Sequence, residues 1–388
     1  MKRFKNRLCL EQPENRQMMA GDIQAINQFG VLRINEAPGH VGGAQNVIIT
    51  QSSDGKVTLT GTTSPVNLTG SLINGKGFDS FFGVTRIEAN LGNGQDVIGI
   101  GGSANQFKIA DLIINTTSPN STTNDADIVT LNNVQVARAL EITTGAGKDT
   151  VRVLNSSIVT NPATQFARFK IDTGVQTTDQ LADRDEVIMT NVSAAVDVSV
   201  KTGGSNDLVT MRNSRIGTTA DHLLWFDLGS GHDTIHLGST PNTYEAVTGV
   251  GSLRIDAGKD AENDVDFVRM EDVFFGQGLS AQMGGGGDRI EMENVQVQKG
   301  MSLNGHSGDD IFALKGVQAM ENFFAKMGDG NDLLEITFLK TRKMDIDGGV
   351  GLGYDMLRIY DSANIPTVIR TNFEEINGQK VVNKKGAK

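Results

Sequence analysis

An aspartate recurs along the chain at a spacing near 22 residues, each time just before a short run of alternating apolar residues. The recurring residues are Asp79, Asp96, Asp127, Asp149, Asp185, Asp207, Asp233, Asp266, Asp288, Asp310, Asp332 and Asp355. Five of the gaps are 22 residues and one is 23, and most of the others correspond to 22 residues plus an inserted loop. One such unit is too small to enclose a core, so the repeat predicts units that stack on one another.

Each repeat contains three short segments with strand-like alternation. From Asp96 onward, the second and fourth residues after the aspartate are apolar and the residue between them is usually polar, as in Ile290, Glu291 and Met292. Further apolar pairs follow at the seventh and ninth positions, and again shortly before the next aspartate. A period of two predicts strands with one face inward. The sequence therefore predicts an all-β, three-sided parallel β-helix (solenoid) of about 22 residues per coil, right-handed by the chirality rule for parallel crossovers.

The sixth position after the aspartate is usually Asn or Asp, which tolerate the left-handed backbone of a corner between strands. The residues at this position are Asn133, Asn155, Asn191, Asn213, Asp272, Asn294 and Asp361.

The repeat also sets the expected domain boundaries. The β-helix is expected over 75–361, after an N-terminal β cap or small β module over 22–74. Residues 362–378 break the pattern and predict a C-terminal cap, followed by a disordered basic tail over 379–388. Residues 1–21 form a separate N-terminal segment.

Charge and composition exclude several classes of function. The formal net charge of −11 argues against nucleic acid as a partner. No run of 18 apolar residues is present, so no membrane span is expected. The single cysteine, Cys9, excludes an internal disulfide framework.

The turn before the aspartate often reads Gly-x-Gly-x-Asp, as in GSGHD (229–233) and GDGND (328–332). Stacked coils would place the carboxylates in a line at intervals of ~4.8 Å. Their repulsion must be offset, either by turn N–H groups or by bound cations. The first alternative is a structural aspartate bonded to backbone amides, and the second is a column of metal ions.

This turn resembles the RTX calcium repeats, most closely in MGDGNDLLE and LGSGHDTIH. The resemblance covers the turn only, because RTX repeats recur every nine residues and this motif recurs about every 22. It implies calcium as the cofactor, and no other cofactor is expected. The residues it implies as calcium ligands are Asp96, Asp149, Asp233, Asp288, Asp329, Asp332 and Asp355.

The segment LEQPENRQMMAGD (10–22) resembles the LEPR-XLL segment that heads many exported bacterial repeat proteins. The matching residues are Leu10, Glu11, Glu14, Arg16, Ala20 and Asp22, whereas Pro13, Met18 and Met19 depart from the pattern. The resemblance implies an exported protein, extracellular or at the cell surface, and says nothing of its chemistry.

Loops inserted before the aspartate turn, at 116–124, 172–184 and 257–264, should project from one edge of the solenoid, where a ligand could bind. The candidate ligand residues beside them are Arg152, Arg212, His236, Arg269 and Glu271. No catalytic residues are assigned. We expect a structural or adhesive protein without catalytic activity, whose partner is a cell-envelope component or an extracellular glycan. The architecture is also similar to that of polysaccharide lyases and hydrolases, so the alternative is a polysaccharide-acting enzyme or a glycan-binding module that uses the loop-bearing edge.

Overall fold

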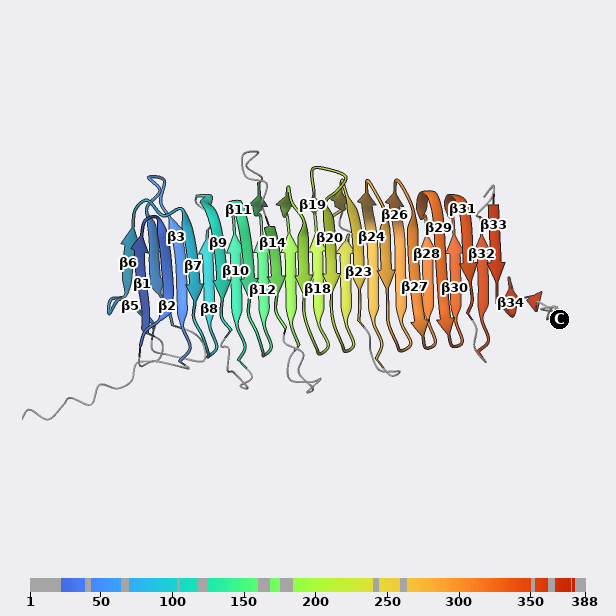
Figure 1. Cartoon of the computed structure of the whole chain (residues 1–388), viewed down its shortest axis with the longest axis horizontal. Coiled ribbons are helices and arrows are strands. Elements are labelled where there is room, and N and C mark those ends of the chain that lie inside the picture. Colours follow the sequence, from blue (N-terminus) through green and yellow to red (C-terminus); the bar gives the residue numbers. More distant parts are fainter. Residues whose placement is uncertain are drawn as a thin grey trace, which may run out of the picture.

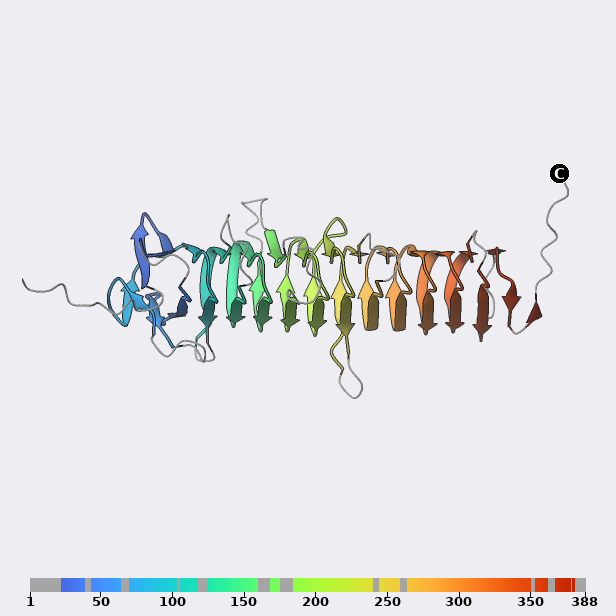
Figure 2. The same ribbon diagram turned by 90° about the horizontal axis from the view of Figure 1, so that it is seen from below.

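The computed structural model describes residues 22–38, 43–63, 70–102, 105–117, 125–159, 168–174, 184–239, 244–258, 264–349, 353–361, 367–377 and 379–380. These residues form short strands stacked along one axis, with β1 near one end of a rod and β34 near the other (Figures 1 and 2). No helix in this part of the chain has the length and apolar character needed to cross a membrane. The chain is a parallel β-solenoid, as the repeat predicts.

The strands that follow the aspartates pair in parallel, each with its counterpart in the next coil. This first stack contains β8 (Val97–Gly101), β10 (Ile128–Asn132), β12 (Thr150–Leu154), β15 (Glu186–Thr190), β18 (Leu208–Arg212), β21 (Thr234–Gly238), β24 (Phe267–Phe275), β26 (Arg289–Val297), β28 (Ile311–Lys315), β30 (Leu333–Thr337) and β32 (Met356–Tyr360). Ile290, Phe312 and Leu334 are partners in register on successive strands. Partners are therefore 22 residues apart where no loop is inserted, as predicted, whereas a turn takes roughly 26 residues on average over the solenoid.

The remaining pairings form two further stacks. The second contains β13 (Ser157–Ile158), β16 (Ser193–Ala194), β19 (Ser214–Ile216) and β22 (Val247–Gly249), with parts of β9, β11, β24, β26, β29 and β31. The third contains β7 (Arg86–Asn90), β9 (Phe107–Asn115), β11 (Val134–Thr143), β14 (Arg168–Asp172), β17 (Val198–Lys201), β20 (Leu223–Asp227), β23 (Ser252–Asp256), β25 (Leu279–Gln282), β27 (Met301–Ser307), β29 (Gln318–Asp329), β31 (Lys340–Asp347) and β33 (Thr367–Thr371). The right-handed winding stays a prediction.

The alternating apolar residues fill the interior along the whole rod. Ile290, Phe312 and Leu334 are fully buried, and so are the apolar pairs of the other two stacks, such as Val295 and Val297. Burying one large apolar side chain stabilises the fold by about 1.5–3 kcal/mol. Since each coil repeats this burial, the core is continuous from coil to coil. A single coil could not enclose a core of its own.

The corner residues adopt the predicted left-handed backbone. All seven residues at the sixth position have positive φ, from +44° at Asn213 to +59° at Asn133. Their amides also bond from coil to coil, with Asn191 Nδ2 donating to Asn155 Oδ1 at 2.7 Å. Asn at this corner therefore lowers backbone strain and links neighbouring coils.

Antiparallel pairing is concentrated at the N-terminal end. The strands there are β1 (Asp22–Gln28), β2 (Val31–Glu36), β3 (Asn46–Gln51), β4 (Val57–Gly61), β5 (Leu72–Ile73), which pairs in parallel with β1, and β6 (Phe78–Phe81). The antiparallel pairs are β1–β2, β3–β4 and β4–β6, while β2 and β3 also pair in parallel with β7 and β8. Counting Asp79 as a repeat aspartate is wrong, because it lies on β6 opposite Leu59 in an antiparallel pair.

At the C-terminal end, β34 (Glu375–Ile376) pairs with β32 and, in antiparallel fashion, with β35 (Gln379–Lys380). Residues 379 and 380, expected in the disordered tail, thus form a strand. The segment 1–21, the rest of the tail and most of the three loops at 116–124, 172–184 and 257–264 lie outside the described residues. The domain boundaries stay predictions.

One corner breaks the Asn rule and gives a test of it. Phe338 occupies the sixth position with φ of +58°, and its side chain is 56% exposed. A bulky residue in this conformation is strained, whereas Asn tolerates it. We expect Phe338→Asn to raise the free energy of unfolding by about 1 kcal/mol in a urea titration. The exposed Phe274 lies on a strand, so Phe274→Asn should give no such gain; equal effects would contradict the corner rule.

Candidate functional site

The repeated aspartates form a continuous hydrogen-bonded line, here called the aspartate ladder, from Asp96 to Asp355. In each step one carboxyl Oδ1 accepts the main-chain N–H of the ladder aspartate in the preceding coil. Asp288 N donates to Asp310 Oδ1 at 2.8 Å, and Asp310 N donates to Asp332 Oδ1 at the same distance. Gln45 N donates to Asp96 at the first end, and Asp355 N donates to Glu374 Oε2 at the last.

The ladder carboxyls are buried, and burial raises the pKa values of six of them from the ordinary 3.8. The pKa is raised to about 10 for Asp96 and Asp185 and to about 8 for Asp127 and Asp310. It is about 7 for Asp332 and about 6 for Asp355, which lie nearer the C-terminal end. Burial is the largest cause in each case, and neighbouring carboxyls add to it. The deepest of these carboxyls are therefore neutral at pH 7.

Small or hydroxyl-bearing residues on the third stack leave room for the carboxyls. A Cβ atom on Gly305 would lie 2.0 Å from Asp310 Oδ2, so only glycine fits there. Thr116 and Thr173, just after β9 and β14, lower the pKa values of Asp127 and Asp185, in partial opposition to burial. The other carboxyl oxygen, Oδ2, is buried in the ladder aspartates from Asp96 to Asp332.

Six of the seven sequence-predicted calcium ligands are members of this ladder. Asp329 is not, because it is an exposed residue at the end of β29. Calcium takes six to eight oxygen ligands, mostly from charged carboxylates. The ladder carboxyls instead bond to backbone amides, and in the described part of the chain no group of three or more acidic, His or Cys side chains could hold a metal ion. The geometry favours the structural alternative, and calcium binding stays a prediction.

The candidate ligand residues project outward from the first stack, where they pair with one another and with neighbours. Arg152 is 3.0 Å from Glu186 on the next strand. Arg269 lies 3.0 Å from Glu271 and 3.9 Å from Glu291. His236 packs edge-on against the Phe267 ring, with the ring centroids 5.8 Å apart. Burial, followed by Arg269 and Arg212, lowers the pKa of His236.

The structure brings only some of these candidate residues together. His236 on β21 is the register partner of Arg269 on β24, and Glu271 follows on the same strand. Arg152 lies on β12, three strands away from β21 in the stack, so it belongs to a separate cluster.

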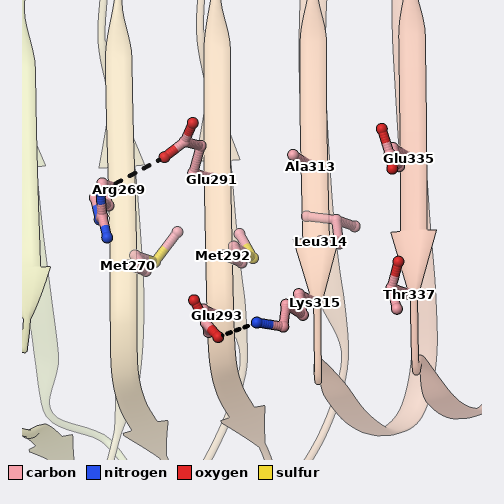
Figure 3. Close-up of a pocket in the computed structure, with 10 residues that line it drawn as sticks. All are labelled: Arg269, Met270, Glu291, Met292, Glu293, Ala313, Leu314, Lys315, Glu335 and Thr337. Atoms are coloured by element: carbon pink, nitrogen blue, oxygen red, sulfur yellow. Dashed lines mark hydrogen bonds and ion pairs between the residues drawn. The ribbon is translucent and has the colours of Figure 1, made fainter. Parts of the chain in front are cut away.

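A shallow hollow of about 280 Å³ opens beside Arg269, and its centre is Ala313 on β28 (Figure 3). The outward neighbours of Ala313 in register are Glu291 on β26 and Glu335 on β30. Lys315 pairs with Glu293 at the edge of the hollow. The hollow exists because alanine stands where the neighbouring strands carry long side chains.

Sequence reasoning missed Ala313, Glu335 and this hollow. The signal was present, since Ala313 occupies the same position after its aspartate as Glu291 and Glu335 do after theirs. A small residue in an outward row of long ones marks a depression.

Comparison with known proteins gives no match to any family model, to any curated protein or to any solved structure.

The raised pKa values predict that stability falls as pH rises. The folded state holds protons that the unfolded chain, with pKa values near 3.8, releases. This stabilisation is complete below about pH 4 and is lost as pH rises through the folded pKa values of about 6 to 10. The melting temperature should therefore fall from about pH 5 to about pH 9, as measured by circular dichroism. A melting temperature that rises over this range would contradict neutral ladder carboxyls.

Substitutions at Asp185 separate the carboxyl charge from its hydrogen bond. Asp185→Asn keeps an acceptor for the Asp149 N–H, 2.8 Å away, and cannot ionise, so it should flatten the pH dependence. Asp185→Ala removes the acceptor and should cost about 1–3 kcal/mol at every pH. Asp221→Asn, at an exposed aspartate, serves as the control and should change neither.

Calcium addition distinguishes the two alternatives for the ladder. With the carboxyls bonded to amides, we expect the same melting temperature at pH 7 in excess calcium and in a chelator. A melting temperature that is higher in calcium, with the increase lost in Asp288→Asn, would instead favour the calcium column.

Proposed function

We propose that the chain is an exported structural or adhesive rod that acts outside the cell or at its surface. One observation carries this proposal: the charged side chains along the flank of the solenoid pair with one another from coil to coil. Arg33 pairs with Glu88 and Arg152 with Glu186, each between strands that are neighbours in a stack.

Such pairing supports a solenoid surface without a catalytic role. Exposed ion pairs contribute at most about 1 kcal/mol each, so their main effect is to neutralise the surface. An active site, in contrast, gathers groups of unequal environment in a cleft. The hollow at Ala313 on the first stack is shallow, and the charged residues that line it are largely paired with one another.

The rod shape also supports the proposal. The first stack from β8 to β32 spans ten inter-strand steps of ~4.8 Å, or about 48 Å. The continuous core and the ladder tie each coil to the next, so the rod resists bending. A rigid, neutralised flank suits a spacer or an adhesive surface. The resemblance of residues 10–22 to the LEPR-XLL segment supports export.

The alternative, a polysaccharide-acting enzyme, is favoured by the two carboxylates on either side of Ala313. Glu291 and Glu335 lie on β26 and β30, two strand steps or ~9.6 Å apart. Inverting glycosidases separate their two carboxyl groups by about 6.5–9.5 Å. However, Glu291 is engaged in ion pairs with Arg269 and with Arg289. The alternative predicts new reducing ends or unsaturated products from acidic or neutral polysaccharides, lost in Glu335→Gln.

Export can be tested on the full chain in a bacterial host whose exported proteins carry the LEPR-XLL segment. We expect the protein in the surface or extracellular fraction, and we expect Glu11→Ala with Arg16→Ala to retain it inside the cell. Asn6→Ala with Gln17→Ala, at positions that are not among the matching residues of the motif, is the matched control. Retention of the unsubstituted chain in the cytoplasm would overturn the proposal.

A further inference from the structure

A second cavity lies on a different face, over the outer surface of β23, β25, β27 and β29. This cavity, here called the Phe324 trough, has a volume of about 350 Å³. Its floor is built from small residues, namely Ser252, Gly278, Ser280, Gly300 and Ser302. Arg254 lines one end and Phe324 the other. Leu223 of β20 also lines the trough, next to Ser252, so the trough crosses five strands and is about 19 Å long.

The register of the third stack creates the trough. Arg254, Ser280, Ser302 and Phe324 are partners on four successive strands, so two serines separate two large side chains. Gly278 and Gly300 add no side chain beside them. The core residues beneath the serines, Leu279 and Met301 among them, are buried, so the floor is firm.

Both ends of the trough carry preorganised flat groups. The Phe324 side chain is 39% exposed, and Lys343 Nζ lies 5.3 Å from its ring centroid. At the other end, the Arg254 guanidinium lies 5.6 Å from the Trp225 ring centroid. Stacking on an aromatic ring limits the motion of Arg254 and leaves guanidinium N–H groups to donate.

The charges around the trough cancel. Arg254 is 3.3 Å from Asp256, and Lys343 is 2.9 Å from Asp345. Lys201, over the other part of Trp225, pairs with Asp227. A trough with locally balanced charge, on a chain of net charge −11, selects neither an acidic ligand nor a cation.

The floor offers hydroxyl groups to a ligand. The Ser252, Ser280 and Ser302 hydroxyls make no side-chain hydrogen bond to any residue that the structure describes. The occupant should therefore have an apolar face for Phe324 and several hydroxyl groups for the serines and Arg254. A pyranose ring has both, and an extended glycan repeats them along its length as the strands repeat along the rod.

We propose that the Phe324 trough binds a neutral oligosaccharide. The pyranose C–H face packs on Phe324, and sugar hydroxyls bond to the serine hydroxyls and to Arg254. The trough lies at the start of the third-stack strands, whereas the insertion at 257–264 follows the end of β23. It is thus separate from the loop-bearing edge. This inference rests on the proposed adhesive role, for which it names the chemistry of the partner.

Trp225 is the only tryptophan in the chain, so its fluorescence reports on this site. The purified full chain is titrated with cellohexaose, maltohexaose and chitohexaose. At least one hexasaccharide should change the emission saturably, because a ligand at Arg254 alters the stacking on Trp225. Phe324→Ala should weaken this binding about tenfold or more. Ser302→Trp places a side chain in the trough and should block binding, measured by calorimetry because it adds a second tryptophan.

Phe274→Ala is the matched control, because Phe274 is 38% exposed on β24 and does not line the trough. Unchanged melting temperatures establish that each variant is folded. No saturable response to any of the three sugars would overturn the proposal, and so would binding that survives both trough substitutions. Tighter binding of an acidic oligosaccharide, such as oligogalacturonate, would overturn its neutral-ligand part. The purified protein is used, so this result is independent of the export test.

Discussion

The hydrogen bond between each ladder carboxyl and the N–H of the preceding coil is the constraint on which the rest of the solenoid depends. Burying a carboxyl is costly unless it is hydrogen-bonded, and each ladder carboxyl accepts a backbone N–H, while burial raises the pKa of members such as Asp310. The bond also fixes the register between neighbouring coils, since the carboxyl of each ladder aspartate must lie beside the backbone N–H of the ladder aspartate in the preceding coil. Insertions of different length can therefore precede the ladder without disturbing the strands that follow it. The solenoid core then stacks in register along the whole rod.

Most of the fold could be predicted from the sequence because its determinants are local and repeated. Period-two alternation placed Ile290, Phe312 and Leu334 inward, and the 22-residue spacing placed them in register. The corner at Asn155 follows from the preference of Asn for positive φ. The motif alone failed at Asp79, where the same glycine-rich turn leads into an antiparallel strand. Strand direction there depends on the N-terminal hairpins, which the turn does not encode.

The candidate sites were harder to predict because they depend on which outward residues become neighbours. The sequence leaves open whether the repeated carboxylates hold cations or bond to turn N–H groups, and the structure shows them buried and bonded to the amides of other ladder aspartates. Both arrangements share one motif, so the motif cannot choose between them. Likewise, Ser280 and Ser302 are ordinary outward residues until the register sets them between Arg254 and Phe324. In the same way, Ala313 forms a hollow only because the register places Glu291 and Glu335 on either side of it.

The ladder has a direction. A coil always offers its amide toward the C-terminus and its carboxyl toward the N-terminus, so the two cut ends of such a rod would be chemically unlike. The chain closes them with different groups: Gln45 supplies an amide at the leading end, and Glu374 supplies a carboxylate at the trailing end. The N–H of a ladder aspartate therefore has its acceptor only once the next coil is in place. Glu374 supplies the acceptor for the last coil and so completes the line of bonds.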